Sequence, residues 1–208
     1  MKRTIKSKAS LLLAGLACMM LSVAANASPV YLDDFKWGAD GFKTGTISPG
    51  GSVAAGKFDF RVDGGPERLD AFCIDVTNTL VKQGEWDKSA AGPSNVLGFA
   101  EVGKLFDYYY GNVDDALFQL ALWKIVTPGG LTATGGALNA LDGAANAIIN
   151  EVKKATAKNL FTLFVLSPKD PIRNQTLITA VPVPEPGSLM LLGLGVLGAG
   201  AARRFRKH

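Results

Sequence analysis

The segment LDAFCIDVTN, residues 69–78, contains Cys73, one of only two cysteines in the chain. The other, Cys18, lies in an N-terminal stretch that the sequence predicts to be removed, so Cys73 would be the only thiol of the mature protein. A lone thiol can act as a nucleophile, form a disulfide with a second chain, or pack as a small buried hydrophobe. The residues next to Cys73 leave these possibilities open.

Gln119 is the second residue whose type and position raise a chemical question. On a helical wheel of residues 113–126, apolar side chains cover nearly every direction, which predicts a buried helix. Gln119 lies between Val126 and Trp123 on this wheel, so we expect its carboxamide to be buried. A buried amide without partners costs about 1–3 kcal/mol. The amide must therefore be hydrogen-bonded in the core, which is the simpler interpretation, or be chemically altered.

The supply of histidine and cysteine excludes several kinds of site. The only histidine is His208, the last residue, so Ser-His-Asp and Cys-His catalysis and histidine-based zinc sites are not available to an exported domain. One cysteine cannot build a cysteine metal site, and acidic segments such as DFRVDGG lack the spacing of a calcium loop. We expect no cofactor, no metal ion and no enzyme activity.

The N-terminal segment has the three parts of a secretory signal peptide. Four basic residues precede a short apolar run, and a small-x-small motif ends at Ala27. We expect a signal helix within residues 1–27 and cleavage by signal peptidase between Ala27 and Ser28. Lipoprotein processing at Cys18 is a weaker alternative, because Gly15 stands where a large aliphatic residue is usual.

The C-terminal segment, residues 182–208, is organised in the same stepwise way. A proline-rich spacer leads to Pro184, Glu185 and Pro186, and alternate prolines favour an extended, semi-rigid chain. An uncharged, glycine- and leucine-rich stretch follows, and we expect a membrane helix over residues 188–202. The tail, residues 203–208, is basic, as the positive-inside rule requires of a cytoplasmic flank. Its arginines are Arg203, Arg204 and Arg206.

Together, these C-terminal features resemble the PEP-CTERM sorting signal of Gram-negative bacteria. The resemblance implies handling by an exosortase, a membrane protease-transpeptidase, with the cut near the Pro-Glu-Pro motif. It also implies an inner-membrane-anchored precursor with a cytoplasmic tail, which is then transferred to the cell surface or extracellular matrix. Such systems commonly accompany exopolysaccharide production and biofilm formation.

Removing the two ends changes the electrostatic argument. Eight of the 22 Lys and Arg residues and one of the 18 acidic residues lie in these ends, so residues 28–184 carry 14 basic and 17 acidic residues. The excess of basic residues therefore belongs to the targeting segments, and the charge gives no support for nucleic-acid binding. The remaining residues, 28–181, suit one globular domain.

Hydrophobic periodicity predicts an α+β domain. Residues 30–82 read mostly as strands, with clear period-two alternation over residues 57–65 and 69–77. Capping and breaking residues then indicate helices and two closing strands. The expected helices span residues 93–111, 112–126, with Asn112 as a candidate cap, and 137–157, and the expected strands span 159–168 and 175–181. This order predicts a strand-rich sheet or barrel with a central helical insertion.

Two short motifs in this domain resemble the thioester domains of bacterial surface adhesins. Phe72-Cys73-Ile74-Asp75 is similar to the aromatic-Cys-aliphatic motif of a strand, and Gln119-Leu120-Ala121-Leu122-Trp123 is similar to the Gln-x-Ala-aliphatic-Trp motif of a helix. The resemblance implies a Cys73–Gln119 thioester inside the fold. A surface ligand or extracellular polysaccharide bearing an amine or hydroxyl would attack it and become covalently attached.

Two further residues gain candidate roles from this resemblance. Asp75 is expected to assist proton transfer or to position a hydrogen bond, unless it is a structural or solvated aspartate. Trp123 is expected to shield the bond from water, or simply to pack in the core. The alternative for the whole domain is a structural or exopolysaccharide-associated matrix protein, in which Cys73 and Gln119 only pack.

Overall fold

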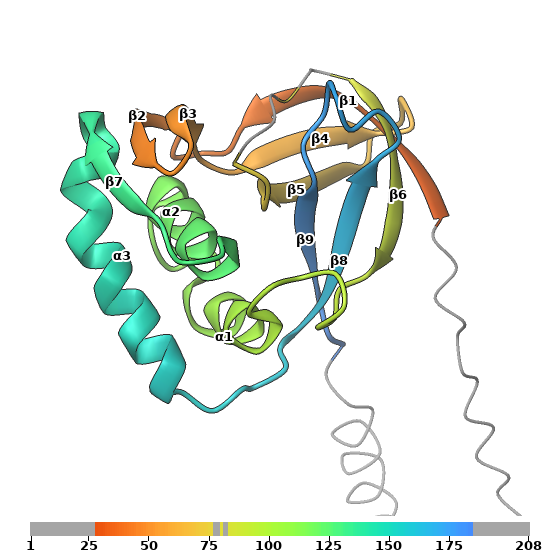
Figure 1. The fold of residues 1–208 in the computed structure, drawn as a ribbon. Helices are drawn as coiled ribbons and strands as arrows, with labels where there is room; N and C mark the ends of the chain where they lie inside the picture. Colours follow the sequence, from red (N-terminus) through yellow and green to blue (C-terminus); the bar gives the residue numbers. More distant parts are fainter. Residues whose placement is uncertain (1–27, 77–79, 81–82, 185–208) are drawn as a thin grey trace, which may run out of the picture.

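Six antiparallel strands close into a barrel in the computed structural model, which describes residues 28–76, 80 and 83–184 (Figure 1). Around the barrel the order is β1-β4-β5-β9-β8-β6. Closure pairs the backbone of every barrel strand on both sides, so the barrel has no free edge. The strands are β1 (Ser28–Trp37), β4 (Phe58–Val62), β5 (Arg68–Cys73), β6 (Gly84–Ala90), β8 (Phe161–Pro168) and β9 (Leu177–Pro182).

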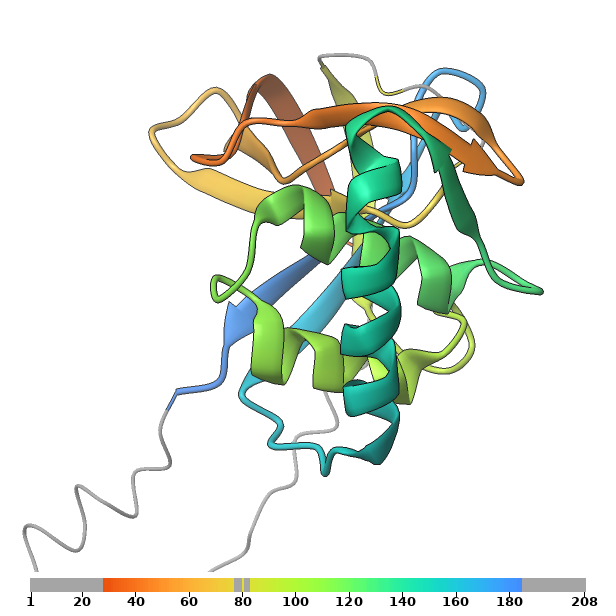
Figure 2. The ribbon, with the colours of Figure 1, turned by 90° about the vertical axis from the view of Figure 1, so that its left-hand side faces the viewer.

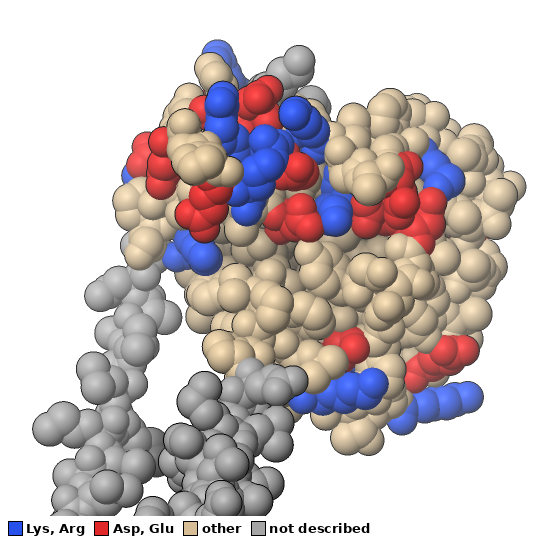
Figure 3. Space-filling model, turned by 180° about the vertical axis from the view of Figure 1, so that it is seen from behind, with Lys and Arg blue, Asp and Glu red and all other residues tan. Residues whose placement is uncertain are grey.

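Alternating residues give the barrel its interior and its surface. Phe60 and Trp86 are fully buried, and their ring centroids lie 6.0 Å apart. The opposite face of β1 and β4 carries charged side chains in ion pairs, such as Arg61 with Asp33 at 3.0 Å. Figure 3 shows acidic and basic side chains intermixed on the face that it displays. The period-two pattern of the sequence thus separates an aromatic core from a charged exterior.

Three helices connect β6 to β8 and cover one side of the barrel. They are α1 (Phe99–Tyr109), α2 (Asp115–Val126) and α3 (Gly136–Lys154). A small sheet of order β3-β2-β7 lies across one end of α2 and α3 (Figure 2). Its strands are β2 (Lys43–Ser48), β3 (Gly51–Ala55) and β7 (Thr132–Gly135). Because α2 packs against α3 on one side and β5 on the other, it is buried almost all round, as its composition predicts.

The predicted α+β class and central helical insertion are confirmed, and of the two strand arrangements expected, a sheet or a barrel, the structure has the barrel. Two helix starts differ from expectation. The cap of α2 is Asp114 and not Asn112: its carboxylate accepts from the N–H groups of Ala116 and Leu117, at 3.0 and 3.2 Å. α1 begins six residues later than predicted, because the Asn95 side chain stabilises a turn by bonding the Gly92 N–H at 2.7 Å.

The expected signal helix, residues 1–27, and the expected membrane helix, residues 188–202, lie outside the described residues. Among the helices that the structure describes, none is long and apolar enough to cross a membrane.

The candidate thioester site

The end of β5 leaves the backbone of Cys73 without a strand partner on one side. β5 pairs with β9 up to Cys73 and Leu177, but its pairing with β4 stops at Ala71 and Phe58. The Ile74 N–H donates to the Thr176 carbonyl on the β9 side, at 3.0 Å. By strand alternation, the N–H and C=O of Cys73 point the other way, past the end of β4.

The side chain of Gln119 fills this position. The Cys73 N–H donates to Gln119 Oε1 at 3.0 Å, and Gln119 Nε2 donates to the Cys73 carbonyl at 2.7 Å. Both residues are 1% exposed. The carboxamide therefore takes the place of a neighbouring strand, and its carbon atom, bonded to both Oε1 and Nε2, is held directly beside Cys73. A buried amide requires hydrogen-bond partners, and here the backbone N–H and C=O of Cys73 supply them.

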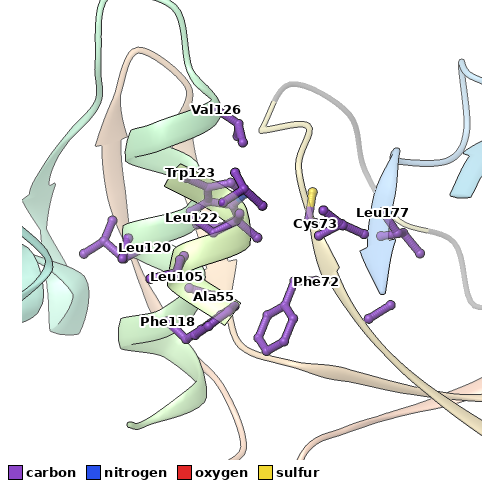
Figure 4. Packing of buried hydrophobic residues seen from close by; sticks show 14 of the residues in the cluster. Ala55, Phe72, Cys73, Leu105, Phe118, Leu120, Leu122, Trp123, Val126 and Leu177 are labelled. Carbon is purple, nitrogen blue, oxygen red and sulfur yellow. The ribbon is translucent and has the colours of Figure 1, made fainter. Parts of the chain in front are cut away.

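Aromatic packing fixes α2 against β5 at this point. The ring of Phe118 packs on Phe72, with centroids 4.5 Å apart, and on Phe106 of α1 at 5.0 Å. Figure 4 shows Phe72 and Phe118 between α2 and β5, next to the level at which Cys73 lies. Since Phe72 precedes Cys73 and Phe118 precedes Gln119, this contact sets the register of the two candidate residues.

The sulfur of Cys73 is hydrogen-bonded to the backbone of Asp75, just beyond the end of β5. The thiol donates to the Asp75 carbonyl at 2.6 Å, and the Asp75 N–H approaches Sγ at 3.3 Å. Burial is the largest influence on this thiol and raises its pKa to about 12, while the hydrogen bond with the Asp75 backbone and the nearby Trp123 indole act in the opposite direction. The thiol is therefore neutral at rest. β5 ends at Cys73, so Asp75 lies beyond the strand and reaches the sulfur through its backbone.

Trp123 lies one helical turn after Gln119 and is 2% exposed. Figure 4 shows it on the side of α2 that faces Cys73. Within the part of the chain that the structure describes, its indole Nε1 has no hydrogen-bond partner.

A groove of about 430 Å³ lies beside the site. Asp75 and Ile74 lie in its wall, together with Val126 at the end of α2. Leu97, which is 53% exposed, stands at its rim and marks it as open to solvent. The groove therefore opens to solvent at the residues that directly follow Cys73 in the chain, although neither Cys73 nor Gln119 lines it.

The structure thus brings together four residues that the sequence singles out: Cys73, Gln119, Asp75 and Trp123. The burial of Cys73 leaves no sulfur surface for a disulfide with a second chain, which removes that alternative. Ser28 begins β1, and Pro184 is the last described residue of the C-terminal segment. The other predicted processing and sorting residues lie outside the described residues: Ala27, Glu185, Pro186, Arg203, Arg204 and Arg206.

Sequence reasoning did not find the backbone groups that contact the candidate pair. The N–H and C=O of Cys73 and the backbone of Asp75 carry no signal of residue type. These backbone groups are free to bind Gln119 because β5 extends beyond its last pair with β4, and only the strand register shows this.

Comparison with protein families shows that residues 182–207 match the PEP-CTERM protein-sorting motif. The motif indicates an exported surface protein that is processed at the membrane by an exosortase. Comparison with curated proteins gave no match.

Among solved structures, the chain resembles the N-terminal domain of the Streptococcus pyogenes pilus tip adhesin Cpa, with a TM-score of 0.51 and 14% identity, over 78% of this chain and 97% of that one. Further neighbours are the N-terminal thioester domain of a Clostridium perfringens surface protein (TM-score 0.45, 15% identity, 62% and 89% covered) and that of the Streptococcus pyogenes fibronectin-binding protein SfbI (0.47, 14%, 78% and 97%). The chain therefore shares its fold with the N-terminal domain of a bacterial surface adhesin.

Proposed function

We propose that residues 28–181 form a covalent adhesion module in which Cys73 and Gln119 close an internal thioester. One observation carries the proposal. Both polar atoms of the Gln119 carboxamide are hydrogen-bonded to the backbone of Cys73, so the amide carbon is held beside the backbone of the residue that carries the thiol. Such fixed proximity is the main requirement for an intramolecular acyl transfer.

The hydrogen bonds of the pair suit the closing reaction. When the Cys73 sulfur attacks the Gln119 amide carbon, negative charge develops on Oε1. The Cys73 N–H, already 3.0 Å from this oxygen, is in position to stabilise that charge. The C–N bond then breaks, the nitrogen takes up the thiol proton, and ammonia leaves. The products are one thioester and one ammonia.

The same geometry suits the opening reaction with a partner. Loss of ammonia frees the Cys73 carbonyl, which had accepted from Nε2 at 2.7 Å. An amine or hydroxyl arriving at that place donates to the same carbonyl while it attacks the thioester carbon. The partner becomes bonded to Gln119, and Cys73 is released as a free thiol. The module is consumed in the reaction, so it acts as a covalent tether and not as an enzyme that turns over.

Targeting segments place this module at the cell surface. We propose that signal peptidase removes residues 1–27 and that the segment 182–208 holds the precursor in the inner membrane, through a helix over residues 188–202 and the basic tail. An exosortase then cuts near Pro184-Glu185-Pro186 and transfers the domain to the surface or matrix. The partner there is a surface ligand or an exopolysaccharide that bears an amine or hydroxyl.

Incubation of the exported protein with methylamine tests the module. The expected result is a tryptic peptide in which Gln119 carries a methylamide, together with one new thiol per chain at Cys73. The Cys73→Ala variant, which keeps the backbone groups that bind Gln119, is expected to incorporate no methylamine. Equal labelling of both proteins, or of neither, would contradict the proposal.

A structural matrix protein is the second candidate function. It is favoured by the fact that both polar atoms of the Gln119 amide are already hydrogen-bonded to the backbone of Cys73, so the amide needs no chemistry to be stable in the core. This candidate predicts that the native chain stays unlabelled by methylamine and keeps its free thiol.

A further inference from the structure

The indole N–H of Trp123 is a buried hydrogen-bond donor next to the candidate site. Trp123 is 98% buried, since only 2% of its surface is exposed, and its indole N–H has no partner among the described residues. The indole of Trp86, which is also buried, donates to the Gln175 carbonyl at 3.1 Å. Buried indole N–H groups normally find such a partner, so the unpaired group of Trp123 calls for an explanation.

The indole of Trp123 faces the sulfur of Cys73. It follows Gln119 by one turn on the side of α2 that meets the end of β5, as Figure 4 shows. Its effect on the Cys73 thiol is that of a side-chain hydrogen bond, which lowers the thiol pKa. The indole N–H nevertheless makes no hydrogen bond to any described residue. The donor thus points at the neutral sulfur without completing a bond to it.

We propose that the Trp123 indole N–H is a hydrogen-bond donor to the Cys73 sulfur when that atom carries negative charge, and so assists both closure and opening of the thioester. The inference rests on the proposed function. A neutral thiol is a weak acceptor, whereas a thiolate accepts strongly, so the bond would form only when charge develops. A donor that is unpaired in the ground state and paired in the transition state accelerates the reaction.

The chemistry is balanced in both directions. In closure, the sulfur loses its proton to the departing amide nitrogen and bonds to the Gln119 carbon as ammonia leaves. In opening, the partner's nitrogen bonds to that carbon, the carbon–sulfur bond breaks, and the sulfur leaves as a thiolate that takes up the proton from the nitrogen. The Asp75 N–H, 3.3 Å from Sγ, is the second donor, and the Asp75 carboxylate is the charged group that acts against the thiolate.

Substitution of Trp123→Phe in the exported protein separates this role from shielding. Phenylalanine keeps an aromatic ring but lacks the N–H. The donor role predicts that Trp123→Phe slows opening by methylamine about tenfold, as expected for the loss of one charge-assisted hydrogen bond. A role confined to excluding water or filling space predicts unchanged or faster opening, because the bond becomes more accessible. The rate is read as the appearance of methylamide by intact mass.

Leu120→Ala is the matched control, since Leu120 is a fully buried residue of α2 that Figure 4 shows on the side of the helix away from Cys73, and its truncation leaves the indole in place. It is expected to lower the melting temperature without slowing the opening. If Trp123→Phe does not fold, benzothienylalanine at position 123 replaces the N–H by sulfur in a ring of the same shape. An unchanged rate in either Trp123 variant, or equal slowing in Leu120→Ala, would overturn the proposal. A native chain without a thioester would instead contradict the proposed function, and this inference with it.

Discussion

Gln119 is fully buried, and among the described residues both of its carboxamide hydrogen bonds are made with the backbone of one other residue, Cys73. Its amide replaces a strand beside Cys73, with bonds of 3.0 and 2.7 Å. An amide suits this place because it offers one acceptor and one donor in a single plane. A carboxylate offers only acceptors and would place an oxygen against the Cys73 carbonyl.

This difference predicts that Gln119→Glu lowers the free energy of unfolding in a pH-dependent way. The substitution is made in the Cys73→Ala variant, so that no thioester can form. Burial and the facing carbonyl raise the pKa of the new carboxyl, because only its protonated form can donate as Nε2 does. With a raised folded-state pKa, the stability contributed by the neutral form is present below the ordinary pKa near ~4.3 and is lost as pH rises through the folded value.

We expect Gln119→Glu to lose about 3 kcal/mol of unfolding free energy between about pH 4 and about pH 8, relative to Cys73→Ala alone. Urea denaturation at both pH values measures this loss. A loss that is independent of pH would show that position 119 does not face the carbonyl of residue 73.

Single residues were the most predictable part of the site. The resemblance of two short motifs to adhesin thioester domains was enough to expect Cys73, Gln119 and Trp123 together, whereas helical periodicity by itself predicted only the burial of Gln119. The role of Asp75 was not predictable, because period-two alternation assumes that β5 continues to Thr77, whereas the strand ends at Cys73. A strand end depends on the partner strand, and residue type alone does not record it.

Among the elements, α2 is the one that has to be held in place, because it carries Gln119 and Trp123. On the side away from β5, Lys124 of α2 pairs with Asp142 of α3 at 2.8 Å, and the Lys124 side chain is only 5% exposed. The same carboxylate accepts from the Ala133 N–H of β7 at 2.7 Å. One buried ion pair therefore joins α2, α3 and the small sheet.

We expect Asp142→Asn to lower the unfolding free energy at neutral pH by about 3 kcal/mol, because it leaves the Lys124 charge buried and unpaired. Burial by itself would raise the pKa of Asp142, but hydrogen bonds from Lys124 and Ala133 outweigh it and lower the pKa below its ordinary value of 3.8. With a lowered folded-state pKa, the contribution is present above 3.8 and is lost as pH falls through the folded value.

Denaturation of the native chain and of Asp142→Asn at about pH 7 and about pH 3 measures the loss of unfolding free energy and the direction in which that loss changes with pH. The difference in unfolding free energy between the native chain and Asp142→Asn should be smaller at the lower pH. Asn146→Ala is a suitable control, because Asn146 donates to the other carboxylate oxygen at 3.1 Å and its loss leaves the ion pair intact. A difference that stays constant in acid would contradict this assignment.

The sequence predicted the existence of these elements better than their limits or their contacts. α3 was expected over residues 137–157 and spans Gly136–Lys154. The contact between Lys124 and Asp142 was not predictable, because it depends on the crossing of two helices whose relative placement no periodicity encodes. The cap of α2 is Asp114 and not the expected Asn112, because the helix starts at Asp115.

At the scale of the whole molecule, the candidate site and the sorting segment lie at opposite ends of one strand. Cys73 pairs with Leu177 at the start of β9, and the chain leaves the barrel after Pro182 at the end of the same strand. Figure 1 shows β9 running through the wall of the barrel between these ends. A domain held at a surface through its C-terminal segment would therefore direct the site away from that surface, where a partner can reach it.

Closure of the barrel was the part of the fold that the sequence predicted least. Alternation identifies β4 and β5 as strands, but the pairing of β1 with β6, and of β6 with β8, joins residues far apart in the chain. Without closure, β9 would not lie beside β5, and the end of β5 would not present the Cys73 backbone to α2. The site is thus a consequence of the topology, even though its residues were visible in the sequence.

The intact mass of the exported protein is the most direct test of the thioester. Mass spectrometry of the native chain is expected to give a value below that of its processed sequence by the mass of one ammonia, and Cys73→Ala is expected to give the mass of its own sequence. A native mass equal to that of the unmodified sequence would contradict the account.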